Sequence, residues 1–275
     1  MEWFAILKQM GIIPFLLIIY VCMGSKEMEK VNLYLGDVRE QIQKIPDQSL
    51  IYWDPNTTST GLSTESFVMI EELWDEINRV AKENCRLLVQ AQQPVVTEFM
   101  LKLENHYDTT WYYINPPTGG ALNLGLIAKP ITRVEEVMVF TLKKNGRKPM
   151  FNILEPYRLL KTQRGTDKLV QMCPENYLEL EPDEFIKGKG LSTSRPVSAL
   201  EYLLQTYSNP ESHVLDLFMG SGSMGVAALN TQRVYSGIDV NLDQFSFAAN
   251  RISSYLQSPN YRKRISKRYG KKLTV

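Results

Sequence analysis

The sequence predicts an α/β fold built on a doubly wound, mostly parallel sheet. Patterns typical of strands and helices alternate along most of the 275 residues, as a parallel sheet with crossover helices requires. A buried-strand pattern at 214–218 leads into a glycine-rich turn and then a helical pattern. The composition, 44% hydrophobic and 22% charged, is that of a globular protein long enough for one packed core with an inserted lobe.

Each element of the first half follows from local periodicity. Residues 50–53 form a continuous apolar run that ends at Asp54-Pro55, which indicates a buried strand followed by a loop. Residues 66–82 carry apolar side chains at helical spacing. The expected elements, in order, are strand 31–35, helix 38–45, strand 50–53, helix 66–82, strand 85–90, helix 95–103, strand 110–114 and strand 134–142.

The second half resumes this alternation after an interruption. Residues 143–190 lose regular period and gather Pro, Gly and mixed charge, which indicates an inserted lobe. The elements expected after the lobe are helix 196–207, strand 214–218, a helix that includes 226–229, strand 233–238 and helix 245–256.

The two ends of the chain differ from the part between them. Residues 1–22 are apolar, but the run Gly11–Cys22 is shorter than the roughly 20 residues that span a bilayer. We expect this extension to lie outside the fold, with Met23 as the true start; a membrane anchor is the alternative, and no stable membrane association is expected. Residues 257–275 form a polar tail rich in Lys and Arg.

Cysteines and histidines argue against several classes of site. Cys22, Cys85 and Cys173 are scattered without C-x-x-C spacing, so we expect neither disulfides nor a zinc site, and a reducing, cytoplasmic location. His106 and His213 are the only histidines. This disfavours a histidine triad or metal centre, and no metal is expected.

The glycine-rich turn gives the most specific functional signal. Gly220, Gly222 and Gly225 form G-x-G-x-x-G between the predicted strand and helix, which lets the backbone turn sharply and approach a ligand. About 20 residues on, the next strand ends in Asp239, whose carboxylate can accept hydrogen bonds from ribose hydroxyls. Asp216 ends the first strand and would repel a pyrophosphate. The pocket therefore suits a nucleoside cofactor with a cationic amino-acid end, such as S-adenosylmethionine.

The same segment resembles a known family. Asp216–Gly225 is similar to the D-P-F-x-G-S-G-T-T-G motif of DNA amino-methyltransferases, which modify N6 of adenine or N4 of cytosine. Ser194–Pro210 resembles the family segment that covers the methionine end of the cofactor, and Gly237–Phe245 resembles its G-I-E-x-D-x-x-Y-F. Further similar segments are 32–37, 45–49 and 121–140. The resemblance covers about 31–252 with the catalytic motif first, the order of the β class, and implies a Rossmann-like S-adenosylmethionine-dependent methyltransferase fold.

This resemblance also implies that three successive segments of the chain have different roles. It makes 23–142 the catalytic half, 143–190 an inserted target-recognition lobe and 191–256 the S-adenosylmethionine-binding half. The residues expected to hold the cofactor are Asp216, Phe218, Gly220, Ser221, Gly222, Asp239, Arg195 and Pro196. Arg195 stands where the family usually has Lys.

The catalytic motif departs from the family pattern. Asp54, Pro55, Asn56 and Thr57 stand where D-P-P-Y is expected. In that motif the acid and a proline carbonyl accept the hydrogens of the target amine, and the aromatic ring stacks on the extruded base. The acid and first proline are kept, but the stacking ring, worth about 1–3 kcal/mol, is missing from its place. The resemblance thus implies an intact cofactor site and a weakened acceptor site.

The predicted function is site-specific methylation of double-stranded DNA, of the kind found in restriction–modification systems. N6 of adenine is favoured over N4 of cytosine, because the cytosine enzymes usually carry Ser in place of Asp54. One alternative is a pseudoenzyme that binds S-adenosylmethionine and DNA and supports a partner subunit; another is a small-molecule or RNA methyltransferase. Basic residues in 143–190 and in the tail are candidate phosphate contacts. The sequence leaves a homodimer and a partner subunit both open.

Overall fold

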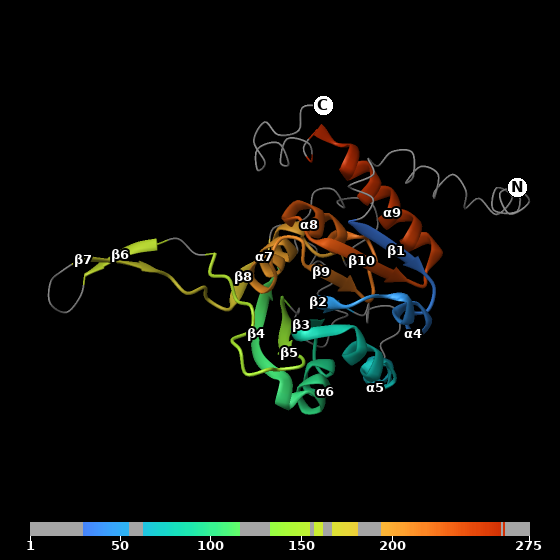
Figure 1. Cartoon of the computed structure of the whole chain (residues 1–275), viewed down its shortest axis with the longest axis horizontal. Helices are drawn as coiled ribbons and strands as arrows, with labels where there is room; N and C mark the ends of the chain where they lie inside the picture. Colours follow the sequence, from blue (N-terminus) through green and yellow to red (C-terminus); the bar gives the residue numbers. More distant parts are fainter. Residues whose placement is uncertain are drawn as a thin grey trace, which may run out of the picture.

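The computed structural model describes residues 30–54, 63–115, 133–154, 157–161, 167–180, 194–259 and 261. In this part of the chain, eight strands form one sheet in the order β1-β10-β9-β2-β3-β5-β4-β8. Helices cover both faces of the sheet (Figure 1). This three-layer arrangement confirms the predicted α/β fold with a doubly wound, mostly parallel sheet.

Five neighbouring strands of the sheet run parallel to one another. They are β1 (Val31–Leu35), β10 (Val234–Asp239), β9 (His213–Asp216), β2 (Gln48–Trp53) and β3 (Ala81–Ala91). The other three are β5 (Val134–Thr141), antiparallel to β3; β4 (Tyr107–Ile114), antiparallel to β5; and β8 (Tyr177–Glu179), parallel to β4. Since β2 lies beside β9, the first and second halves of the chain meet in the middle of the sheet.

Alternate side chains of the strands pack into two separate hydrophobic cores, one on each face of the sheet. On one face they pack against α7 (Val197–Tyr207), α8 (Ser223–Thr231) and α9 (Leu242–Gln257). On the other face they pack against α4 (Val38–Gln41), α5 (Ser63–Val80) and α6 (Val95–Lys102). Leu50 and Tyr52 of β2 point into the first core, and Ile51 and Trp53 into the second. The continuous apolar run that predicted β2 reflects this burial on both faces.

Most predicted elements lie within a few residues of their observed bounds, with two differences. The helix predicted at 66–82 ends at Val80, because β3 begins at Ala81. The predicted helix at 38–45 is a short α4 continued by the 3₁₀ turn η1 (Ile42–Lys44), and a second 3₁₀ turn, η2 (Glu104–His106), precedes β4.

The segment 143–190 contains strands that its sequence did not predict. β6 (Tyr157–Lys161) and β7 (Asp167–Gln171) form an antiparallel hairpin that projects away from the body of the molecule (Figure 1). β8 joins the main sheet beside β4. Because β8 is only three residues long, its sequence is too short to display the two-residue alternation of a strand.

Some predictions fall outside the described residues. These are the apolar extension 1–22, the motif residues Pro55, Asn56 and Thr57, and all of the basic tail from 262 onward. Among the helices that the structure describes, none is both long and apolar enough to cross a membrane.

Candidate functional site

A cavity of about 230 Å³ opens at the carboxyl ends of the parallel strands β2, β9 and β10. Asp54 follows β2, Asp216 ends β9 and Asp239 ends β10. All three line the cavity, together with Arg195 from the segment before α7. In a parallel α/β sheet, this edge is where ligands bind, and the strand order brings together acids that are up to 185 residues apart.

The glycine turn between β9 and α8 needs residues without a side chain. Gly220 and Gly222 have φ values of +49° and +74°, a left-handed conformation that strains other residues. A Cβ added to Gly222 would lie 3.0 Å from the Cβ and 3.1 Å from the Cα of Ala248. Gly222 is also the N-cap of α8, so the turn lays the start of this helix along the cavity wall.

Asp239 is held in place by the turn that it faces. Its Oδ2 accepts a hydrogen bond from the Gly220 N–H and its Oδ1 one from the Asn241 N–H, both at 2.8 Å. Burial raises the pKa of Asp239, and these two hydrogen bonds oppose the rise. Each carboxylate oxygen keeps a second lone pair. The group can therefore accept hydrogen bonds from the hydroxyls of a ligand in the cavity.

Asp216 is an acid buried at the floor of the cavity, with only 2% of its surface exposed. It accepts hydrogen bonds from the Tyr235 hydroxyl at 3.0 Å and the Phe218 N–H at 3.3 Å. Burial raises the pKa of Asp216 to about 8. Within the described part of the chain no Lys, Arg or His forms an ion pair with it. A cationic ligand placed beside Asp216 would therefore favour its ionised form.

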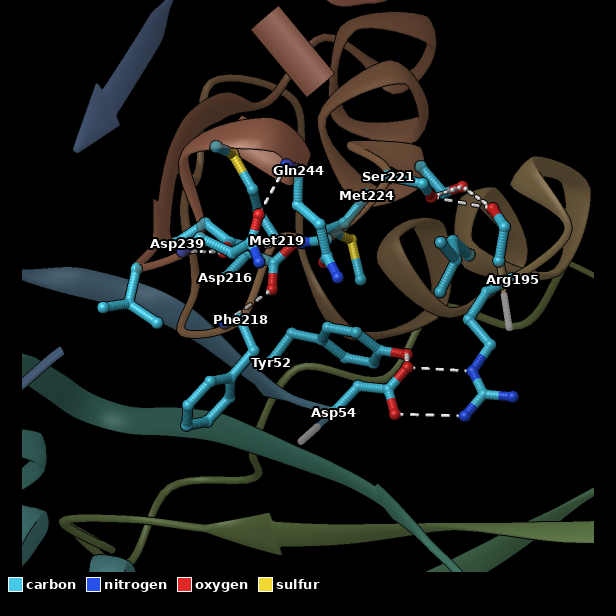
Figure 2. Close-up of a pocket in the computed structure, with 16 residues that line it drawn as sticks. Tyr52, Asp54, Arg195, Asp216, Phe218, Met219, Ser221, Met224, Asp239 and Gln244 are labelled. Atoms are coloured by element: carbon cyan, nitrogen blue, oxygen red, sulfur yellow. Dashed lines mark hydrogen bonds and ion pairs between the residues drawn. The ribbon is translucent and has the colours of Figure 1, made fainter. Parts of the chain in front are cut away.

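A cluster of three serine hydroxyl groups lines another part of the cavity. We call Ser194, Ser221 and Ser223 the serine cluster: the Ser194 Oγ lies 2.7 Å from the Oγ of Ser221 and 2.9 Å from that of Ser223 (Figure 2). Behind it, the Arg251 Nη1 donates to the Ser223 Oγ at 2.8 Å and to the Ser221 carbonyl at 3.2 Å. Hydroxyls, a guanidinium and the first turn of α8 together suit a carboxylate ligand. Of these four residues, only Ser221 was predicted as a ligand-binding residue.

Asp54 forms a two-point ion pair with Arg195. The Arg195 Nε and Nη2 donate to the Asp54 Oδ2 and Oδ1 at 2.8 and 3.1 Å (Figure 2). The Arg195 Nη1 forms a second ion pair with Glu135 of β5. Burial alone would lower the pKa of Arg195, but the charges of Asp54 and Glu135 raise it, so the guanidinium stays charged.

The structure brings most of the predicted cofactor residues around this one cavity. Those that line it are Arg195, Asp216, Phe218, Gly220, Ser221 and Asp239. Gly222 lies one residue away as the cap of α8, and Pro196 is the residue that precedes α7. Asp54 is the one residue of the predicted catalytic motif that the structure describes, and it lines the same cavity.

Two charged residues of the site were not predicted, although each leaves a signal in the sequence. Glu135 lies on β5 and is 8% exposed, so it is an acid on the inward side of an apolar strand. Arg251 lies on the same inner face of α9 as the buried residues Ala248 and Ile252 and is 6% exposed. A charge at a buried position predicts a partner, but the sequence does not say which one.

Comparison with known proteins places this fold and cavity in a family. A family model described as DNA methylase, of the N6/N4 type, matches residues 48–250. The Type II methyltransferase M.HpaI of Haemophilus parainfluenzae is 24% identical over 216 residues, 73% of this chain and 64% of that protein. M.HinfI of Haemophilus influenzae is 25% identical over 273 residues, 84% of this chain and 72% of that protein. The chain thus spans less than two thirds of the length of M.HpaI.

Solved structures share the fold. The M1.HpyAVI–SAM complex superposes with a TM-score of 0.58 at 18% sequence identity, covering 81% of this chain and 98% of that one. The cytosine-N4-specific PvuII DNA methyltransferase superposes with a TM-score of 0.55 at 14% identity, covering 86% of this chain and 93% of that one. The family match contains the strand end that carries Asp54, the glycine turn and Asp239. The chain therefore belongs to the DNA methylase family.

Proposed function

We propose that this protein transfers a methyl group from S-adenosylmethionine to an exocyclic amine of a base in double-stranded DNA. The observation that carries the proposal is the position of Asp54 on the same cavity as the glycine turn, Asp216 and Asp239. An acceptor for amine hydrogens and a site for a nucleoside thus share one space. Proximity of this kind is what a transfer between two bound molecules requires.

The chemistry of the cavity wall fits each part of S-adenosylmethionine. Asp239 would bind the ribose hydroxyls, and Asp216 would lie at the cationic part of the amino-acid end. The serine cluster and Arg251 would hold the carboxylate, while Phe218, Gly220, Ser221 and Gly222 form the turn that lies along the ligand, with Pro196 starting the adjacent helix. When bound, the cofactor supplies an electrophilic methyl group on a sulfonium.

Asp54 would act on the DNA side of the cavity. The target base has to leave the helix before its amine can reach the site. A carboxylate that accepts an amine hydrogen localises the nitrogen lone pair for attack, and one amine hydrogen then leaves as a proton. By resemblance the Pro55 carbonyl would accept the second hydrogen, whereas Asn56 and Thr57 provide no stacking ring. The presence of Asp at position 54 favours adenine N6 over cytosine N4.

The lobe 143–190 is proposed to contact the DNA backbone and to read the target sequence. Its first cations, Lys143, Lys144, Arg147 and Lys148, are exposed, but they follow β5 at the sheet edge opposite the cavity, because β5 runs antiparallel to β3. The proposed phosphate contacts are therefore assigned to the rest of the lobe. Such contacts release counterions, so DNA binding should weaken steeply with salt. The hairpin of β6 and β7 projects from the body of the molecule (Figure 1), and we propose that it contacts the duplex there.

The test is methyl transfer from labelled S-adenosylmethionine to unmethylated plasmid DNA, followed by nucleoside analysis. We expect labelled N6-methyldeoxyadenosine; labelled N4-methyldeoxycytidine would instead assign the cytosine amine. Asp54→Ala should lower the rate by about 10²–10³-fold while calorimetry detects unchanged cofactor binding. Asp75→Asn, an exposed acid on α5, is the matched control and should keep full activity. Cofactor binding by the wild type without any transfer to DNA contradicts the proposal.

A further inference from the structure

The ion pair between Arg195 and Asp54 leaves both groups with unused hydrogen-bonding capacity. A guanidinium has five N–H donors. In the described part of the chain, Arg195 directs two of them to Asp54 and one to Glu135. Its two other N–H groups therefore have no partner among the described residues. Arg195 lines the cavity and its side chain is 22% exposed, so these donors are within reach of a ligand.

Asp54 retains an acceptor position beside those donors. Its two oxygens offer about four lone-pair positions. Arg195 occupies one on each oxygen, and the Tyr52 hydroxyl, whose single proton goes to the Gln90 Oε1, lies 3.4 Å from the Oδ2. The Oδ1 is left with one position toward a ligand, counting the described residues. The pair thus presents an acceptor and a cationic donor side by side (Figure 2).

We infer that Asp54 and Arg195 together read the Watson–Crick edge of the extruded base. Adenine carries its N6 amine beside the acceptor N1, and cytosine carries its N4 amine beside the acceptor N3. Asp54 would accept from the amine, and Arg195 would donate to the neighbouring ring nitrogen. Guanine and thymine present the reverse order, a carbonyl beside a ring N–H. Their carbonyl oxygen would face the acceptor Asp54, and their ring N–H would face the donor Arg195. This inference rests on the proposed function and gives Arg195 a base-selecting role, in place of the cofactor contact that the family resemblance implied.

The surroundings hold the pair in a fixed orientation. Glu135, which binds the far side of Arg195, accepts hydrogen bonds from Gln90 at 3.1 Å and from Asn115 at 2.9 Å. The Gln90 Oε1 in turn accepts from the Tyr52 hydroxyl at 2.5 Å. Asp54 and Glu135 are both mostly buried, with side chains 15% and 11% exposed. The network therefore clamps the guanidinium from both sides and fixes the direction of its remaining donors.

The identity of the cation at position 195 matters for this role. The guanidinium is a planar fork that bridges two carboxylates and still has donors in the same plane. The ammonium group of a lysine is a point charge with three donors on a flexible stem. A lysine ammonium could pair with one carboxylate. It could not at the same time bind Asp54 through two hydrogen bonds, contact Glu135 and donate to a base edge. We therefore expect lysine to replace arginine poorly here.

The experiment compares two duplexes at a target site mapped by methylation-sensitive sequencing. One carries the natural target nucleotide, and the other carries the same nucleotide with the ring nitrogen replaced by C–H: 1-deaza-2′-deoxyadenosine for adenine, or 3-deaza-2′-deoxycytidine for cytosine. The wild type should lose about ten- to a hundredfold in kcat/KM on the deaza duplex, because a charge-assisted hydrogen bond is lost. Arg195→Lys should be slower on the natural duplex and should show a smaller difference between the two.

A second variant keeps the test decisive if the removal of Arg195 unfolds the protein. Arg195→Met leaves two buried carboxylates unpaired, so it is combined with Glu135→Gln to remove one charge. A thermal melt and calorimetric cofactor binding establish that the double variant is folded. It should methylate both duplexes at similar low rates. Arg39→Met, at an exposed ion pair on α4, is the control and should discriminate as the wild type does.

The outcomes distinguish a failure of the role of Arg195 from a failure of the proposed function. Equal use of both duplexes by the wild type, or undiminished discrimination in the folded double variant, overturns the role of Arg195 and leaves the proposed function intact. Absence of transfer to the natural duplex overturns both.

Discussion

The buried carboxyl of Asp216 makes the stability of the protein depend on pH. Burial raises the pKa of Asp216 from 3.8 to about 8, so between these values the folded protein holds a proton that the unfolded chain has lost. The stabilisation is complete below pH 4 and is lost as pH rises toward 8. Over most of this range the slope is about 1.4 kcal/mol per pH unit. From pH 6 to pH 8 the loss is about 2 kcal/mol, because the slope flattens as the folded group begins to ionise.

Asp216→Asn removes this titration and keeps the shape of the side chain. A loss of about 2 kcal/mol corresponds to a fall in Tm of roughly 4–8 °C for a domain of this size. We expect the Tm of the wild type, measured by scanning fluorimetry without cofactor, to fall by this amount more than that of Asp216→Asn between pH 6 and pH 8. Burial also raises the pKa of Asp239, but that acid is present in both proteins, so its effect cancels in the difference.

Binding of a cationic ligand should favour loss of the proton from the Asp216 carboxyl. If the amino-acid end of S-adenosylmethionine lies beside Asp216, it stabilises the ionised carboxylate, and the affinity of the wild type should rise between pH 6 and pH 7.5. The affinity of Asp216→Asn should be lower and should rise less with pH over this interval. Parallel melting curves for the two proteins across the whole pH range would refute the reasoning, because they would mean that Asp216 is ionised at pH 6.

Three other substitutions test single features of the site. Tyr113→Phe should raise the free energy of unfolding by about 1 kcal/mol in denaturant titrations, since the Tyr113 hydroxyl is buried without a hydrogen-bond partner among the described residues; a loss of stability would reveal a partner. Gly222→Ala should destabilise the protein by about 1–3 kcal/mol, because it places a Cβ at φ +74° and 3.0 Å from that of Ala248; an unchanged Tm would contradict the strain. Arg251→Met should weaken calorimetric binding of S-adenosylmethionine by about ten- to a hundredfold through the loss of its support to Ser223; unchanged affinity would place the ligand carboxylate elsewhere.

The sequence predicted the parts of the site that are local along the chain. The strand before Asp216, the glycine turn and the acid at the end of the next strand form one continuous βαβ unit, and periodicity and spacing are enough to locate it. The strand end that carries Asp54 was visible for the same reason. In each case, a short apolar run followed by a breaker or an acid determines where the strand stops.

The features that sequence did not predict depend on contacts between distant segments. Arg195 and Asp54 are 141 residues apart, and their pairing depends on the position of β2 beside β9. Glu135 reaches Arg195 because β5 runs antiparallel to β3, and apolar periodicity carries no information on strand direction. β8 is too short for its pattern to be read, and it forms a strand only because β4 offers an open edge.

The order of the strands has a consequence for how the protein could be divided. β1 comes from the first half of the chain, yet in the described part it pairs only with β10 of the second half. A cut within 143–190 would give one fragment whose opening strand has no neighbour of its own and another whose β9 has lost β2. Each fragment would bring only part of the cavity, so neither should bind the cofactor when purified apart. The interleaved sheet thus makes the two halves of the chain depend on each other for the formation of one site.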